Sequence, residues 1–181
     1  MRILGVDPGS RATGYGVVQL DRGREELVEY GVLKLDGAKS HALRLKQIYE
    51  RLTHVIERCK PDECAIEMPV YGKNPQSMLK LGRAQAAAML AVLNRDIPTV
   101  EYTPKEVKRA VCGNGNAAKE QVWFMVCSIL KIERGQEKAG LDATDALAVA
   151  LCHSHRKAGP AKPNYKDWAS FIRDNPDRMV G

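Results

Sequence analysis

Four acidic residues stand in otherwise apolar segments, and they constrain the fold more than any other feature of the sequence. Asp7 ends one apolar run, Glu67 ends a second, and Asp142 and Asp145 lie three residues apart in a third. A carboxylate at the end of a buried element destabilises the fold unless it is paired, protonated or bound to a metal. If the fold brings these segment ends together, it creates a site for hard cations, which prefer oxygen ligands.

Three of the acids also have a simpler structural interpretation. Asp142 and Asp145 would suit the start of a helix, where carboxylates accept hydrogen bonds from free N–H groups. Asp7 belongs to an Asp-Pro-Gly sequence, which is common in turns. Glu67 is harder to explain in this way, because it follows an apolar strand. The spacing of the helical pair puts both carboxylates on one side of the helix in either case.

The order of the predicted elements favours an α/β or α+β fold with a mixed sheet. Strands are predicted at 2–7, 13–20, 25–35, 63–68 and 98–102. Helices are predicted at 41–59, 75–94, 117–132 and 141–156, and another starts at Pro104. The first three strands are joined by short turns and indicate an antiparallel meander, whereas helices separate the later strands.

The helix predicted at 75–94 is unusually apolar. From Ala84 to Leu93 it is apolar nearly all round, which indicates burial on more than one side. Gly82 and Ala86 are small and four residues apart, so another helix could approach closely there. We expect one side to cover the sheet and the other to meet a second subunit. The alternative is a central helix within a single core.

The composition indicates what kind of molecule the protein binds. The chain has 181 residues and a formal net charge of +6. An acidic site in a basic protein fits a polyanionic partner such as nucleic acid, although surplus lysines alone would also give this charge. Five irregularly spaced cysteines without a CxxC pair argue against a disulfide framework or a zinc site. Cys152, His153 and His155 are interpreted as part of a helix end.

Residues 1–158 are expected to form one domain. The segment 159–181 is a polar tail in which Trp168, Phe171 and Ile172 recur at helical spacing, so either a short docked helix or a mobile tail fits the pattern. No apolar run is long enough to span a membrane, and no signal peptide is recognised. A cytoplasmic protein without membrane contact is therefore expected.

Four segments together resemble the RuvC family of bacterial Holliday junction endonucleases. Residues 5–16, which read Gly-Val-Asp-Pro-Gly-Ser-Arg-Ala-Thr-Gly-Tyr-Gly, resemble the opening of that family. Ala-Ile-Glu at 65–67, followed by Gly-Lys-Asn at 72–74, resembles its second motif. Residues 79–85 resemble its long central helix, and residues 142–148 its C-terminal acidic motif. The four segments keep the family's order and spacing over about residues 1–156.

The resemblance implies a ribonuclease-H-like α/β fold, in which a mixed central sheet of three antiparallel and then parallel strands is flanked by helices. It implies a homodimer that makes paired symmetric nicks at a four-way DNA junction and works with the RuvA–RuvB branch-migration complex. The expected cofactor is Mg²⁺, two ions per subunit, with Mn²⁺ as a substitute. The catalytic and metal-binding residues would be Asp7, Glu67, Asp142 and Asp145. Some relatives carry histidine at one of the last two positions, so the division of labour between these two stays open.

Six further residues are expected to contact DNA. They are Tyr71, Lys73, Asn74, Arg83, Lys108 and Lys119. Lys108 and Lys119 match basic positions of the family, and Lys119 stands near a helix N-terminus, where phosphates bind well. Tyr71 would stack on an unpaired base, although the family's aromatic is often one residue earlier, where this chain has Val70. The alternatives are solvated surface charges for the lysines and packing within its own loop for Tyr71.

Other functions fit parts of the sequence. Actin-like and sugar-kinase ATPases also open with a Gly-x-Asp-x-Gly strand and turn, but they need a second lobe, for which 181 residues leave no room. A non-catalytic junction-binding protein is disfavoured because all four acids are present. An RNA-processing ribonuclease-H-like protein stays open as an alternative.

Overall fold

A five-stranded mixed sheet forms the centre of the molecule. The computed structural model describes residues 1–69, 74–132 and 140–158. The strands are β1 (Arg2–Asp7), β2 (Ala12–Asp21), β3 (Arg24–Lys34), β4 (Glu63–Glu67) and β5 (Thr99–Tyr102), and their order in the sheet is β3-β2-β1-β4-β5. The first three strands are antiparallel, whereas β4 pairs parallel to β1 and β5 pairs parallel to β4. The predicted mixed sheet is therefore confirmed.

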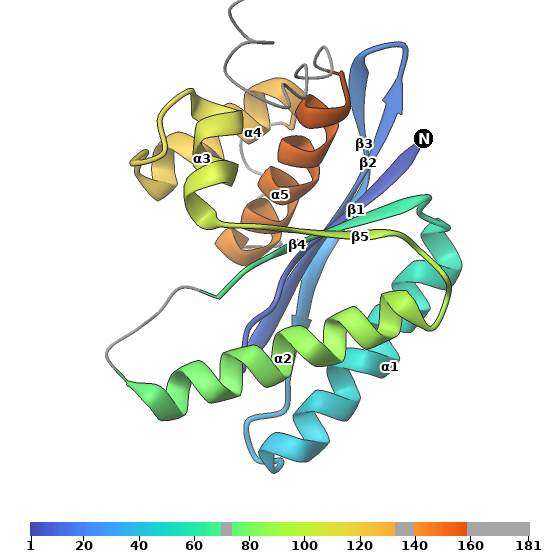
Figure 1. The fold of residues 1–181 in the computed structure, drawn as a ribbon, viewed down its shortest axis with the longest axis vertical. Coiled ribbons are helices and arrows are strands. Elements are labelled where there is room, and N and C mark those ends of the chain that lie inside the picture. Colours follow the sequence, from blue (N-terminus) through green and yellow to red (C-terminus); the bar gives the residue numbers. More distant parts are fainter. Residues whose placement is uncertain (70–73, 133–139, 159–181) are drawn as a thin grey trace, which may run out of the picture.

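Helices cover both faces of this sheet (Figure 1). They are α1 (His41–Cys59), α2 (Pro75–Leu93), α3 (Pro104–Cys112), α4 (Lys119–Leu130) and α5 (Gly140–Ala158). α1 and α2 pack on one face, and α3, α4 and α5 pack on the other. Local sequence sets several helix starts: Asn74 caps α2 ahead of Pro75, and Thr103 with Glu106 forms a capping box at α3.

The alternation of side chains along the strands decides which acids face which layer. Leu4 and Val6 belong to the core under α1 and α2, whereas Ile3 belongs to the core under α5. Because side chains alternate between faces, Asp7 shares the face of Ile3. Glu67 likewise shares the face of Ala65, which also packs under α5. Both strand-end acids therefore point to the layer that contains α5.

Only one side of α2 is covered within the chain. Ala84, Ala88 and Ala91 are buried, but Leu79 and Leu90 on the other side are 56% and 53% exposed. The alternative of a central helix enclosed in a single core is therefore wrong for this chain as far as its described residues extend.

Within the described ranges, no helix combines the length and the apolar character needed to cross a membrane. The predicted tail at 159–181 lies outside the described residues.

Candidate active site

Two parallel strands bring Asp7 and Glu67 to the same edge of the sheet. Each is the last residue of its strand, and the register pairs Val6 of β1 with Ile66 of β4. The carboxyl ends of parallel strands are a common location for active sites, because the side chains there converge at one edge. The strand arrangement thus explains how two acids 60 residues apart in sequence become neighbours.

Helix α5 brings the other two acids to this edge because glycines let it lie unusually close to the sheet. A Cβ atom added at Gly14 would fall far inside contact distance of the Asp142 carbonyl oxygen, and one added at Gly5 would clash with the backbone of Ala146. At Gly16 an added Cβ would collide with the Leu147 side chain. Because these glycines of β1 and β2 have no side chains, the first turns of α5 pack directly against the backbone of the two strands.

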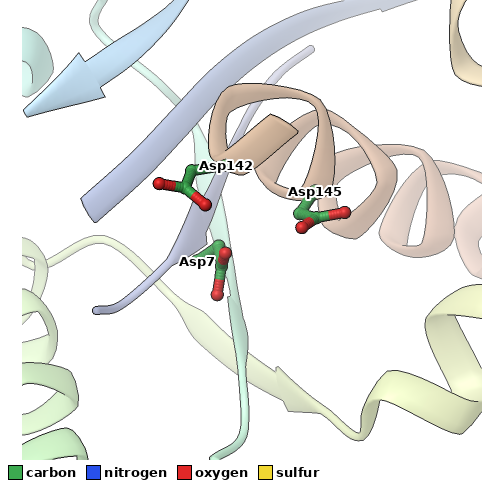
Figure 2. A group of neighbouring side chains, drawn as sticks. All are labelled: Asp7, Asp142 and Asp145. Atoms are coloured by element: carbon green, nitrogen blue, oxygen red, sulfur yellow. The ribbon is translucent and has the colours of Figure 1, made fainter. Parts of the chain in front are cut away.

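Three aspartates form a compact group at the end of β1. Asp7, Asp142 and Asp145 each offer a carboxylate oxygen, and these oxygens lie within 4.8 Å of one another. Figure 2 shows Asp7 on its strand beside the first turns of α5, which carry the other two. Among the residues that the structure describes, no other set of three His, Cys, Asp or Glu side chains meets this criterion.

A cavity of about 260 Å³ beside this group combines acids with lysines. Its charged lining residues are Asp7, Glu67, Asp145, Lys108 and Lys119. Lys119 lies in the first turn of α4, and its Nζ donates to Asp145 Oδ2 at a distance of 3.1 Å. Glu67 shares this cavity but lies outside the group of three aspartate oxygens. The arrangement offers carboxylates for cations and ammonium groups for phosphate in one space.

Burial and mutual repulsion perturb the two strand-end acids strongly. Burial, followed by the nearby Asp145 and Asp142, raises the pKa of Asp7 to about 7, although Lys119 acts in the opposite direction. Burial, followed by Asp7 and Asp145, raises the pKa of Glu67 to about 8. Such crowding is unfavourable for carboxylates alone, and it is relieved when a positive charge lies between them.

The donor set fits a hard divalent cation. Carboxylate oxygens are the preferred ligands of Mg²⁺ and Mn²⁺, and neither histidine nor cysteine belongs to the group of three. A dication among the acids would offset the repulsion that raises the pKa of Asp7. Asp7, Asp142 and Asp145 are thus placed to hold such an ion, with Glu67 near enough for its pKa to respond to two of them.

The remaining residues expected to contact DNA are distributed differently. Asn74 accepts from the N–H groups of Gln76 and Ser77 as the cap of α2. Arg83 lies in the middle of α2, in a groove with Leu45 and other residues of α1, and it does not line the acid cavity. Arg83 was expected from the sequence as a DNA contact, and its distance from the acids depends on where α2 packs. Tyr71, Lys73 and Val70 lie outside the described residues.

Two features of the site were not expected from the sequence. The first is the close packing of α5 on glycines of the sheet. The sequence contained a sign of it, because Gly5, Gly14 and Gly16 lie on one face of the first two strands. The second is a buried set of polar contacts around His153, which had been interpreted as part of a helix end. A buried histidine is visible only once the helix has been placed against the sheet.

Comparison with known proteins gives a consistent result. The family model described as Crossover junction endodeoxyribonuclease RuvC matches residues 3–153. The protein of that name from Salinibacter ruber is 58% identical over 179 residues, which cover 99% of each chain. That from Porphyromonas gingivalis is 46% identical over 181 residues, which cover 98% of this chain and 96% of the relative.

Solved structures agree with the sequence matches. Thermus thermophilus RuvC in complex with a Holliday junction substrate matches with a TM-score of 0.79 at 31% identity, covering 87% of this chain and 94% of that one. The yeast mitochondrial Holliday junction resolvase matches with a TM-score of 0.62 at 12% identity, which supports the fold alone. The predicted ribonuclease-H-like fold is confirmed by the Thermus structures.

Proposed function

The chain belongs to the RuvC family of crossover junction endodeoxyribonucleases, and from this premise we propose that it resolves four-way DNA junctions by metal-dependent hydrolysis at the acid cavity. The observation that carries the assignment is the convergence of three aspartate oxygens within 4.8 Å, beside a cavity that also contains Glu67 and two lysines. A junction-binding protein without catalysis would have no need for this costly grouping of acids.

In this proposal Asp7, Glu67, Asp142 and Asp145 are the catalytic acids and hold the metal. The expected ions are Mg²⁺, two per subunit, and Mn²⁺ is expected to replace them. Divalent ions, when bound, supply an activated water and charge neutralisation for in-line displacement at phosphorus. Asp7 is the central acid. It belongs to the group of three aspartates, and its strand β1 pairs with β4, the strand that ends in Glu67.

Lys108 and Lys119 are proposed to receive the phosphate backbone. Both line the cavity that holds the acids, so a phosphodiester drawn to the lysines would lie next to the carboxylates. Such contacts would position the scissile phosphate without specifying sequence. Tyr71, Lys73, Asn74 and Arg83 are retained as predicted DNA contacts.

The functional unit is proposed to be a homodimer formed through α2. The exposed side of this helix carries Leu79, Leu90 and Leu93, and a Cβ added at Gly82 would meet none of the described residues within 4 Å. Large apolar side chains gathered on one helix face commonly mark an interface. Two subunits would provide two active sites for the paired nicks. The family also gives a RuvA–RuvB complex as the expected partner.

One experiment tests the function as a whole. The protein is incubated with a mobile synthetic four-way junction, a linear duplex and an RNA–DNA hybrid, each with and without Mg²⁺. The proposal predicts symmetric nicks in the junction alone, and only with the metal. Cleavage of the hybrid in preference to the junction would instead favour the RNA-processing alternative, and junction binding without any cleavage would favour a non-catalytic role.

A further inference from the structure

A buried polar network lies on α5, nearer to the C-terminal end of the helix than its two aspartates. His153 is 2% exposed and forms two hydrogen bonds across the layer. Its Nδ1 is 2.8 Å from the hydroxyl of Tyr102, and its Nε2 is 2.5 Å from Oε2 of Glu63. Lys157 Nζ donates to the other carboxylate oxygen of Glu63 at 2.7 Å. One imidazole thus connects α5 with both β4 and β5.

The two strands that His153 contacts are those that position Glu67. Glu63 is the first residue of β4 and Glu67 is the last. Tyr102 is directly opposite Glu67 in the register of β4 with β5, and its carbonyl oxygen accepts from the Met68 N–H at 2.8 Å. His153 therefore bonds to the beginning of the strand that ends in Glu67 and to the residue beside that glutamate.

The contact of α5 with β1 and β2 differs in kind from its contact with β4 and β5. On β1 and β2 the helix lies in close van der Waals contact over Gly5, Gly14 and Gly16, which fixes its aspartates relative to Asp7. On β4 and β5 the helix forms hydrogen bonds through His153 to Tyr102 and Glu63, and Lys157 also donates to Glu63. Ser154 of α5 donates in the same way to Glu25 of β3. Hydrogen bonds have a narrow range of favourable distance and angle, so they determine a position more sharply than apolar contact does.

We propose that His153 is a positioning residue for the nuclease reaction. Through Tyr102 and Glu63 it sets the distance between the aspartates of α5 and Glu67, and so completes the four-acid site. The inference rests on the proposed function, because it assigns a role in assembling that site. His153 is not a catalytic residue, since it lies eight positions beyond Asp145 on α5 and does not line the acid cavity.

The network is also expected to respond sharply to the loss of any member. A buried donor or acceptor that loses its partner keeps its desolvation penalty, and linked hydrogen bonds depend on one another. Loss of the Tyr102 hydroxyl would leave His153 Nδ1 unpaired. The imidazole could then shift, and the helix with it.

The test compares variants of graded severity with a matched control. Tyr102→Phe removes one hydroxyl and keeps the ring, and His153→Gln removes the bridge. Glu63→Gln keeps an oxygen that accepts from His153, whereas Glu63→Ala removes it. The control is His54→Gln, which changes an exposed histidine on α1. Each protein is assayed for thermal midpoint, junction binding in EDTA, Mn²⁺ binding by calorimetry without DNA, and nicking over a Mg²⁺ titration.

We expect Tyr102→Phe and Glu63→Ala to bind Mn²⁺ more weakly and to need more Mg²⁺ for half-maximal nicking. The nicking rate should fall by roughly tenfold, since a misplacement of about 1 Å can cost up to about a hundredfold. Junction binding in EDTA should be unchanged, and Glu63→Gln and His54→Gln should resemble the wild type.

A purely structural role gives a different result. Variants that melt earlier but keep wild-type Mn²⁺ affinity and Mg²⁺ dependence well below their melting temperature would overturn the proposal. If His153→Gln does not fold, the milder Tyr102→Phe still decides the matter. Failure of the proposed function itself is recognised separately, because then the wild type does not nick junctions at any Mg²⁺ concentration, while calorimetry still reports on the positioning of the acids.

Discussion

Asp7 is a buried acid that lies beside other acids at the proposed reaction centre. It ends the central strand of the sheet, and its oxygen belongs to the group of three. Burial, followed by two other aspartates, raises its pKa. A residue chosen for stability would avoid this position. Its presence is therefore best explained by a ligand of opposite charge.

The pKa shifts of Asp7 and Glu67 predict that stability depends on pH in an unusual direction. Their folded-state pKa values are about 7 and about 8, above the ordinary 3.8 and 4.5, so the folded state keeps protons that the unfolded chain releases. The contribution of these two acids to stability without metal is thus greatest below the ordinary values and falls as the pH rises through them towards about 8. Urea unfolding in EDTA at a series of pH values should show this fall, with a smaller fall for Asp7→Asn. A variant as pH-dependent as the wild type would contradict the shift.

Lys119 is predicted to contact phosphate while it neighbours Asp145. Replacing it with alanine should make the salt dependence of junction binding shallower by about one in the slope of log K against log salt. Nicking should also decrease, because the lysine lines the acid cavity. Lys39→Ala is the control, since that lysine pairs with Asp36 in the turn before α1 and should leave the slope unchanged. Equal slopes for Lys119→Ala and the wild type would argue against a phosphate contact.

At the scale of elements, the close contact of α5 with β1 and β2 is the feature that assembles the site. Gly14→Ala should push the helix away, because the new methyl group would collide with the backbone carbonyl of Asp142. Overpacking of this kind costs about 1–3 kcal/mol, and the displaced aspartates should also lower nicking. Gly37→Ala is the matched control, since a Cβ there meets none of the described residues within 4 Å. Chemical denaturation and nicking assays of both variants check this. Unchanged stability and nicking in Gly14→Ala would contradict the tight packing.

The sequence predicts the elements better than it predicts their contacts. The cap of α2 at Asn74 and the start of α3 at Thr103 were predictable because side chains satisfy nearby backbone groups. The convergence of Asp7 with the aspartates of α5 followed from segment ends and from the family resemblance. Neither the burial of His153 nor the location of Arg83 in a groove with α1 was predictable, because both depend on how distant elements pack.

At the scale of the whole molecule, the exposed face of α2 predicts self-association. Leu90 is 53% exposed on this face, so Leu90→Glu should leave the subunit folded and convert a dimer to monomers. Val28→Glu is the control, because Val28 is 41% exposed on β3, away from that helix. Sedimentation velocity and circular dichroism distinguish dissociation from unfolding. A Leu90→Glu protein that stays dimeric would exclude the α2 face as the interface.

The central claim is that the acids around Asp7 form a metal-dependent nuclease centre. Single-turnover nicking of a mobile four-way junction by the wild type and by Asp7→Asn, with junction affinity measured in parallel, tests it most directly. We predict that Asp7→Asn binds the junction as well as the wild type and that its nicking rate in Mg²⁺ falls by at least roughly a hundredfold, as expected when a preorganised electrostatic group at the reaction centre is lost. An Asp7→Asn protein that nicks the junction at the wild-type rate would contradict the assignment.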